Sequence, residues 1–384
     1  MRQQPQSQLN RPWVDWTARQ IHDPVWRLRY LRAVAPPPAT PSRWKSRKTI
    51  GLLTLLAVGG VAAPLSLLKL RAADAASPTV AALPAAPPAR HVELAAVTPN
   101  ADVWQVEKSS DFETYSNGLR VENQYAVSHH PRAYTAFSRS YLDGSAGEKR
   151  SAPAGIVYHT TESLQAPFES SQNNVLKRVG ESLIEYVRRR RCYNFLIDRF
   201  GRVFRIVNES DAADHAGHSV WADEQYFYVN LNDSFIGVSF EAQTEAGQTT
   251  STVGDAQIRA AAMLTEMLRS RYKIPGGNCV THAQVSVNPT NMQIGFHVDW
   301  ASSFPFARLG LPDNYATPSP AVSLFGFGVD ASFEQRAGVR LAAGALGAAR
   351  TVAEQAEASH LSLAAYRKEL HKRYLKIAGG HHKG

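Results

Sequence analysis

The sequence has little cysteine: only 2 cysteines occur among its 384 residues, so at most one intramolecular disulfide can form. This scarcity excludes a small protein held together by a disulfide framework. Charged residues are also modest in number, at 20% against 44% hydrophobic residues. That balance excludes a fully disordered chain, and it provides enough apolar side chains for one or two ordinary cores.

The central part of the chain lacks a surplus of positive charge. The whole sequence has a net charge of +9, which alone would suggest binding to nucleic acid or to a membrane surface. However, residues 1–71 contain 12 basic and 2 acidic residues, whereas residues 151–315 contain 14 basic and 17 acidic residues. The surplus therefore belongs to the N-terminal tail, and we expect no nucleic-acid partner for the central part.

One uncharged run, residues 49–68, predicts a transmembrane helix. Its 20 residues suit a hydrocarbon core of about 30 Å. Because basic residues cluster directly before it, the positive-inside rule places residues 1–48, a basic tail, in the cytoplasm. We expect a single-pass protein of the inner (cytoplasmic) membrane with its catalytic domain in the periplasm. A cleaved signal peptide and an apolar hairpin buried in a soluble domain are the alternatives.

Four further segments follow from composition and pattern. Residues 69–92 form an Ala/Pro-rich linker. Residues 93–150 form a lead-in region that we expect to be loosely structured, with possible short strands near residues 103–106 and 119–121. Residues 151–315 alternate strand-like and helix-like patterns, which predicts an α/β domain with a sheet covered by helices. Residues 316–384 predict a C-terminal helical module.

Individual elements can be expected from the spacing of apolar residues. Short apolar runs predict strands at 155–161, 193–198, 203–207 and 236–241. Apolar residues spaced three and four apart predict helices over 175–187, 258–268, 332–358 and 361–376.

Polar residues stand at the ends of three predicted strands: His159, His282, and the pair His297 and Asp299. Side chains from neighbouring strand ends can converge on one site. Two imidazoles and a carboxylate with an open fourth position form a catalytic zinc set. The wide spacing of these residues is no local zinc signature, so three unrelated polar residues are the alternative from spacing alone.

The order of motifs is more specific than any spacing. The chain contains VYHTT, YNFLIDRFGRVFRI, DHAGHS, NDSFIGVSFEA, IPGGNCVTH and GFHVDWASSFPF, in this order, within residues 153–309. This order resembles the zinc-dependent N-acetylmuramoyl-L-alanine amidases of the type-2 amidase family, which share their fold with peptidoglycan recognition proteins. The resemblance implies a central mixed β-sheet flanked by helices, Zn2+ as cofactor and peptidoglycan as partner.

The resemblance also implies the metal ligands. His159 and His282 match the two zinc histidines, and Asp299 matches the third ligand. His297 stands where many members have a lysine that stabilises an oxyanion, so it either assists catalysis or replaces Asp299 as ligand, and we favour Asp299. Trp300 and the alanine after it replace the Pro-Gly that usually follows the third ligand.

Further residues carry over from the family pattern. Tyr193 matches a tyrosine near the metal. Ser239 stands where some members have a catalytic glutamate, and Glu241, two residues further on the same strand face, could serve instead; a structural acid is the alternative. The substrate-binding residues implied are His215, Thr160 and Asn194.

The implied reaction is hydrolysis of the amide between N-acetylmuramic acid and L-alanine in peptidoglycan. Tyr193 and His297 would stabilise the oxyanion, and Glu241 or His297 would pass a proton to the leaving amine. Two other functions stay open. They are a peptidoglycan-binding recognition module without a competent metal site, and an amidase acting on soluble anhydro-muropeptides.

The two cysteines allow one further expectation. If Tyr193 faces the site, Cys192 faces the other way. Cys279 lies three residues before His282, so we expect it to face away from the site as well. Both thiols could then lie on one side of the sheet, where an exported location permits a bridge. Two free thiols are equally compatible with the sequence.

Overall fold

The computed structural model describes residues 102–244 and 253–379. The predicted cytoplasmic tail, transmembrane helix and Ala/Pro-rich linker therefore lie outside the described residues. Within those two ranges, no helix is both long and apolar enough to span a bilayer.

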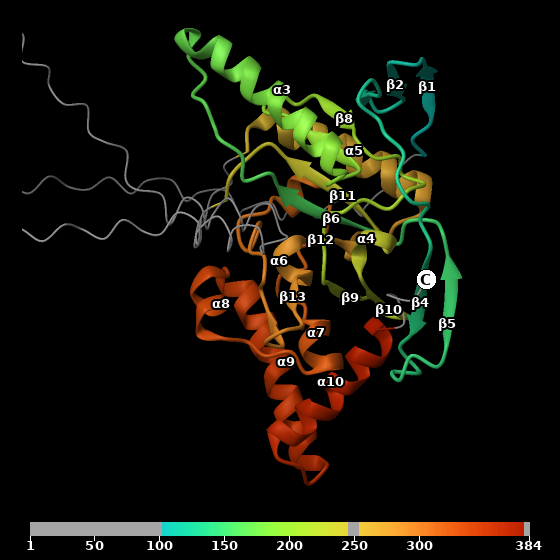
Figure 1. Cartoon of the computed structure of the whole chain (residues 1–384), viewed down its shortest axis with the longest axis vertical. Coiled ribbons are helices and arrows are strands. Elements are labelled where there is room, and N and C mark those ends of the chain that lie inside the picture. The colour runs from blue at the N-terminus through green and yellow to red at the C-terminus, as the bar shows by residue number, and fades with distance from the viewer. Residues whose placement is uncertain (1–101, 245–252, 380–384) are drawn as a thin grey trace, which may run out of the picture. The chain divides into compact units, whose positions relative to one another are not determined.

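The central element is a mixed sheet with eight strands among the described residues (Figure 1). In spatial order the strands are β1 (Gln105–Lys108), β2 (Phe112–Tyr115), β3 (Arg120–Glu122), β8 (Val203–Arg205), β7 (Phe195–Ile197), β11 (Phe235–Phe240), β6 (Gly155–Thr160) and β12 (Cys279–Thr281). β11 pairs in parallel with β6 and β7, β12 pairs in parallel with β6, and β7 and β8 are antiparallel. β6 and β11 are buried along their whole length, as expected for parallel strands covered on both faces.

Two helices cover opposite faces of this sheet. α5 (Asp255–Tyr272) packs through residues such as Leu264 against the face that holds Ile156 and Tyr158. α3 (Asn173–Arg190) packs through residues such as Ile184 against Leu196 on the other face. Both helices coincide with the predicted apolar spacing, and the predicted sheet flanked by helices is confirmed.

The lead-in region differs from its prediction. We expected it to be loosely structured, but it forms β1, β2 and β3 of the central sheet together with β4 (Tyr134–Ser138) and β5 (Gly147–Arg150). β4 and β5 belong to a second sheet of order β5-β4-β10-β9, completed by β10 (Tyr226–Val229) and β9 (Val220–Ala222). β1 and β3 lie close to the possible short strands expected near residues 103–106 and 119–121. β2, β4 and β5 were missed because they are short and partly polar.

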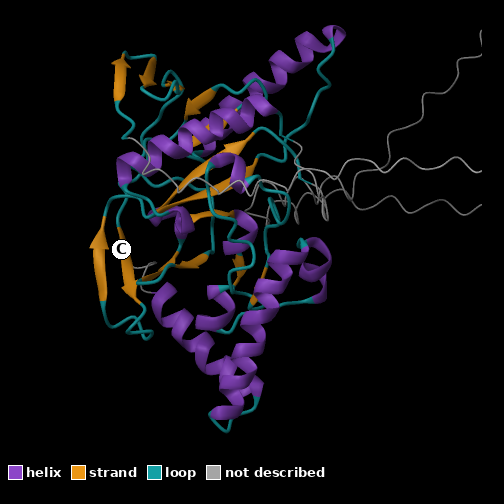
Figure 2. Cartoon of the chain, turned by 180° about the vertical axis from the view of Figure 1, so that it is seen from behind, coloured by secondary structure: helices purple, strands orange, loops and turns teal. Residues whose placement is uncertain are grey.

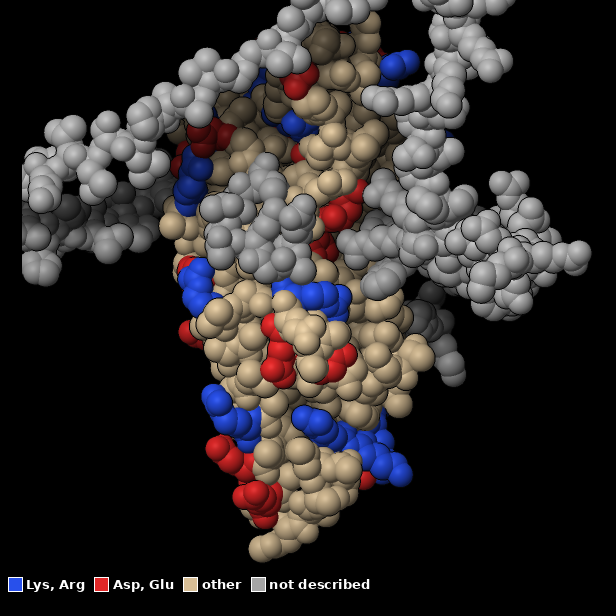
Figure 3. All heavy atoms as spheres, turned by 90° about the vertical axis from the view of Figure 1, so that its left-hand side faces the viewer, with Lys and Arg blue, Asp and Glu red and all other residues tan. Residues whose placement is uncertain are grey.

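The C-terminal segment is helical, as predicted, but it is divided differently. It contains α7 (Pro320–Phe325), α8 (Ala331–Arg336), α9 (Val339–Ala358) and α10 (Leu363–Gly379) (Figure 2). One helix was expected over 332–358, but the chain leaves the helix at Ala337 and restarts after Gly338, where a β-carbon would come within 2.8 Å of the Ser302 side chain. On the face shown in Figure 3, basic and acidic side chains lie close together over these helices.

One large hydrophobic core joins all three predicted segments of the described chain. It contains Val121 from the lead-in region, Ile156 from the predicted amidase domain and Phe325 from the C-terminal helices. The ring of Phe325 packs edge-on against Phe227 with centroids 5.7 Å apart. The strands that carry the candidate site therefore pack against segments that precede them and segments that follow them in the sequence.

Candidate metal centre

His159 lies near the carboxyl end of β6, between β11 and the edge strand β12. Its partner across the strand pair is Ser239 of β11, and the residue is only 1% exposed. The side chain lies on the same face of β6 as Val157 because residues two apart on a strand point the same way. Its Nδ1 lies 3.3 Å from an Asp299 carboxylate oxygen.

His282 begins the short helix α6 (His282–Val285), directly after β12. The backbone amide of the preceding Thr281 donates a 2.9 Å hydrogen bond to the Gln284 side chain, which helps to fix where the chain turns from strand to helix. His282 Nδ1 lies 2.9 Å from the second carboxylate oxygen of Asp299. β12 lies beside β6, so the parallel pairing brings the two histidines to one end of the sheet.

Asp299 comes from the loop after β14 (Gln293–Ile294), a strand paired with β13 (Val287–Asn288). The next residue, Trp300, has a positive φ of 58° and a fully buried indole between Phe240 and Phe304. The phenol of Tyr315 donates a 2.8 Å hydrogen bond to the Trp300 carbonyl. Packing and this hydrogen bond therefore hold Trp300, the first of the two residues that stand in place of the usual Pro-Gly.

The side chains of His159, His282 and Asp299 each present one ligand atom, and these atoms lie within 4.8 Å of one another in a buried group. Burial, together with neighbouring His282, lowers the pKa of His159 to about 4. Burial alone would raise the pKa of Asp299, but the two histidines hold it well below its ordinary value. The group therefore offers a neutral imidazole and a carboxylate at pH 7.

This donor set fits a zinc ion. Zinc binds imidazole nitrogen and carboxylate oxygen, and a site with three protein ligands leaves a position for water or substrate. Both His159 and His282 turn Nδ1 toward the Asp299 carboxylate, so the donor atoms converge.

His297 and Tyr193 flank this group. The His297 ring stacks on the His282 ring with centroids 4.5 Å apart and planes at 20°, and its backbone amide donates to Ser286 Oγ at 2.9 Å. The carboxylate of Asp299 is directed at both His159 and His282. The Tyr193 ring centroid lies 5.2 Å from that of His159, and burial raises the pKa of the phenol well above its ordinary range.

Glu241 lies just beyond the end of β11, and its carboxylate accepts a hydrogen bond of 3.2 Å from the Arg199 amide. It borders a cleft of about 870 Å³ that is walled mainly by α3 and the turn between β7 and β8. Burial raises the pKa of Glu241. The Arg199 hydrogen bond ties Glu241 to the neighbouring backbone, in keeping with the structural alternative. Ser239, which lies beside His159, has a buried hydroxyl without a partner.

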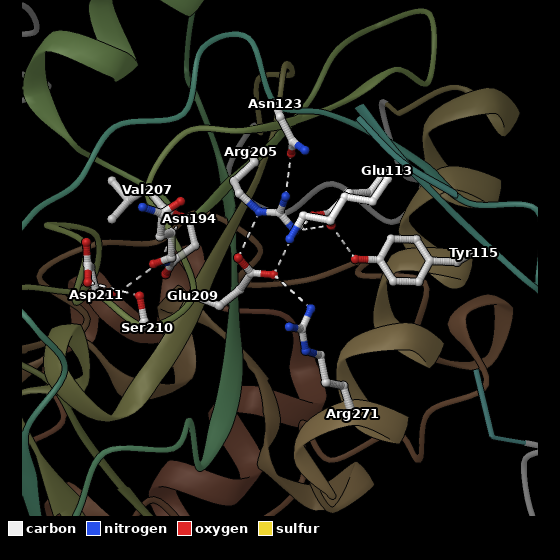
Figure 4. A network of polar contacts seen from close by, with 12 residues as sticks. Glu113, Tyr115, Asn123, Asn194, Arg205, Val207, Glu209, Ser210, Asp211 and Arg271 are labelled. Carbon is white, nitrogen blue, oxygen red and sulfur yellow. Dashed lines mark hydrogen bonds and ion pairs between the residues drawn. The ribbon is translucent and has the colours of Figure 1, made fainter. Parts of the chain in front are cut away.

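The three expected substrate-binding residues are buried, which corrects the expectation for Asn194 in particular. Asn194 is 0% exposed; its amide nitrogen donates to three carbonyls, including that of Val207, and its oxygen accepts from Gly237 (Figure 4). With both ends of its amide used, Asn194 holds the backbone together and has nothing to offer a substrate.

Thr160 and His215 are also engaged within the protein. The Thr160 hydroxyl donates to Glu162 at 2.7 Å. Instead of lining an open pocket, His215 lies against His159, with Nδ1 3.1 Å from His159 Nε2, and burial lowers its pKa well below the ordinary value. Cys192 and Cys279 are not joined by a disulfide, so the expected bridge is not formed.

Sequence reasoning missed Arg132. This residue is 2% exposed and lies in the lead-in region, outside every motif used above. Its guanidinium donates to five backbone carbonyls, those of Glu209, Asp211, Asn232, Asp233 and Phe235. Nothing in the local sequence distinguishes it from a surface arginine, since its acceptors are main-chain atoms.

Comparison with known proteins gives the class of this domain. Residues 149–293, less than half of the chain, match the family model described as N-acetylmuramoyl-L-alanine amidase. The chain therefore carries a domain of the type-2 amidase family, and the resemblance seen in the sequence is confirmed. No curated protein is similar enough to the chain to count as a match.

Among solved structures the similarity is weak. The amidase LysC from Clostridium intestinale is 17% identical over 48% of this chain and 92% of its own, with a TM-score of 0.27. AmiD from E. coli, solved with an anhydro-muropeptide substrate, is 23% identical over 41% of this chain and 56% of its own, with a TM-score of 0.30. The Drosophila recognition protein PGRP-SD is 16% identical over 42% and 84%, with a TM-score of 0.25. The assignment rests on the family model.

Proposed function

We propose that the chain is a zinc-dependent amidase that cleaves the bond between N-acetylmuramic acid and L-alanine in peptidoglycan. His159, His282 and Asp299 would hold the zinc ion. When bound, zinc supplies a Lewis acid that polarises a carbonyl group and lowers the pKa of water to about 7. The observation that carries the proposal is the buried convergence of these three side chains within a domain of the amidase family.

The other residues of the site would handle charge and protons. Tyr193, whose raised pKa keeps the phenol protonated at neutral pH, can donate a hydrogen bond from Oη to the oxygen of the scissile carbonyl. His297 lies beside His282 and can pass a proton from its ring to the leaving amine. We assign the proton transfer to His297 in preference to Glu241, because the Glu241 carboxylate is bound to the Arg199 amide.

The test is zinc content and muropeptide hydrolysis on the full chain and on the variant His282→Ala. We expect about one zinc per wild-type chain, with release of the stem peptide from muramic acid, and a loss of both properties in the variant. His218→Ala is the matched control, because His218 is an exposed histidine of the same fold. Binding of muropeptide without zinc or turnover would replace this proposal with a recognition module.

Comparing hydrolysis of an intact sacculus with hydrolysis of soluble anhydro-muropeptides then identifies the substrate.

The location is a proposal from the sequence alone. Residues 49–68 would anchor the chain in the cytoplasmic membrane and place the amidase domain in the periplasm. Its support is the length of the uncharged run and the basic residues before it. Protease added to spheroplasts should digest the amidase domain and spare the N-terminal tail; protection of the domain would contradict the proposed orientation.

A further inference from the structure

A chain of hydrogen bonds leads from the candidate ligand His159 into the protein. His159 Nε2 lies 3.1 Å from His215 Nδ1, and His215 Nε2 lies 3.2 Å from the carbonyl oxygen of Phe235. A carbonyl oxygen can only accept, so His215 Nε2 carries the proton and its Nδ1 is the acceptor. His159 must then donate from Nε2. This leaves the Nδ1 lone pair of His159 directed toward Asp299, where the metal would be held.

The carbonyl at the end of this chain is itself held in place. Phe235 lies before the part of β11 that pairs with β7, which begins at Val238. Arg132 fills this position: its Nη1 donates to the Phe235 carbonyl at 3.0 Å and to that of Asp233 at 2.8 Å. Because the guanidinium is planar and bonded on several sides, it fixes the direction of the carbonyl.

The backbone at Gly237 leaves room for the His215 ring. A β-carbon at Gly237 would come within 2.6 Å of His215 Cγ, so only glycine leaves space for the imidazole at this point of β11. The Asn232 side-chain oxygen accepts from the amide of His215 at 3.0 Å and from that of Ala216 at 2.6 Å. Packing at Gly237 therefore confines the His215 ring, and Asn232 fixes the backbone that carries it.

We propose that Arg132 and His215 are positioning residues that keep the proton of His159 on Nε2 and so present its Nδ1 to the metal. A second partner of this kind orients a ligating histidine and raises its basicity. Arg132 lies outside the matched residues 149–293, so the lead-in region completes the site. The metal-binding part of the inference rests on the proposed function; the protonation pattern does not.

The first test is the protonation of the two rings in the full chain, read from long-range 1H–15N spectra with histidine labelled. His159→Gln and His215→Gln assign the signals. We expect a proton on Nε2 of both His159 and His215, with or without zinc. A bare Nε2 on His159, or a proton on His215 Nδ1 in place of Nε2, would overturn the inference. Because this readout needs no metal, it stands even where the zinc proposal fails.

The second test is zinc affinity in competition with a chelator. His215→Phe should weaken binding 10- to 100-fold, the usual effect of losing such a partner, whereas His218→Phe in the same loop should not. His215→Gln offers one acceptor and one donor, so it should retain more affinity than His215→Phe.

Arg132→Lys keeps the charge but loses the planar donors, so it should also weaken zinc binding. Arg139→Lys is its control, an exposed arginine that donates to one carbonyl. Circular dichroism of each metal-free variant establishes that it is folded. Zinc affinities within twofold of wild type in folded His215→Phe and Arg132→Lys would refute the positioning role.

Discussion

At the scale of single residues, the geometry of the candidate metal centre depends on positions that carry no metal-binding chemistry. Gly237 leaves space for the His215 ring, and Trp300 holds a positive φ directly after Asp299. Both residues act through close packing, in which one methylene of excess volume is felt. Substitutions at such positions should change metal binding and stability together.

Gly237→Ala should destabilise the protein by about 1–3 kcal/mol, because the new methyl group overlaps the His215 ring. Gly180→Ala is the matched control: Gly180 lies inside α3, where an added β-carbon meets nothing within 4 Å. The control should be neutral or stabilising by about 1 kcal/mol through helix propensity. Urea unfolding of both variants measures the difference, and equal effects would contradict the crowding argument.

Tyr315→Phe tests the support of the Asp299 loop. The Tyr315 hydroxyl is buried, donates to the Trp300 carbonyl at 2.8 Å and accepts from the Phe304 amide at 3.1 Å. Its removal leaves both partners unsatisfied and should cost about 1–3 kcal/mol, with weaker zinc binding. Tyr141→Phe, at a tyrosine that is 56% exposed, should change neither property. Thermal unfolding and chelator competition give the two readouts.

At the scale of elements, a buried ionic network fastens the lead-in strands to the amidase domain. Arg205 of β8 lies 3.0 Å from Glu113 of β2 and 2.8 Å from Glu209, and the Tyr115 phenol donates to Glu113 at 2.6 Å (Figure 4). Asn123 also accepts from Arg205. The network ties β2, which belongs to the predicted loose region, to a central strand pair.

The network predicts a loss of stability in acid. Burial alone would raise the pKa of Glu113, but the Tyr115 hydrogen bond and the Arg205 charge lower it below its ordinary value. A carboxyl with a lowered folded pKa stabilises the protein above its unfolded pKa, and this contribution is lost as pH falls through the folded pKa. The free energy of unfolding should therefore fall below about pH 4.5.

Glu113→Gln should remove that part of the pH dependence. At neutral pH the variant should be less stable by about 1–3 kcal/mol, because a charge-assisted hydrogen bond to buried Arg205 is lost. Below pH 4.5 its unfolding free energy should change less steeply than that of wild type. Glu107→Gln, on the exposed strand β1, removes the same charge without the network. Parallel curves for wild type and Glu113→Gln would contradict the assignment.

At the scale of the whole described chain, the C-terminal helices belong to the core of the amidase domain. Phe325 packs on Phe227 and on Tyr374, and the Arg373 guanidinium donates to the Leu324 carbonyl at 3.1 Å. A chain that ends at residue 315 should therefore expose apolar surface of the remaining domain. We expect it to aggregate or to be digested rapidly by protease, whereas a chain that ends at residue 379 should behave as wild type. A stable, zinc-binding product from the shorter chain would show that the helices are a separate module.

The sequence alone determined the family, the two long helices α3 and α5, the buried strands β6 and β11, and the three candidate ligands. These features follow from local spacing or from motifs in a fixed order, which a linear pattern retains. The strands β2, β4 and β5, the break at Gly338, and the contacts of Asn194, His215 and Arg132 were decided only by the tertiary structure. Their partners are backbone carbonyls and rings distant along the chain, and the direction of a hydrogen bond depends on which atoms folding brings together.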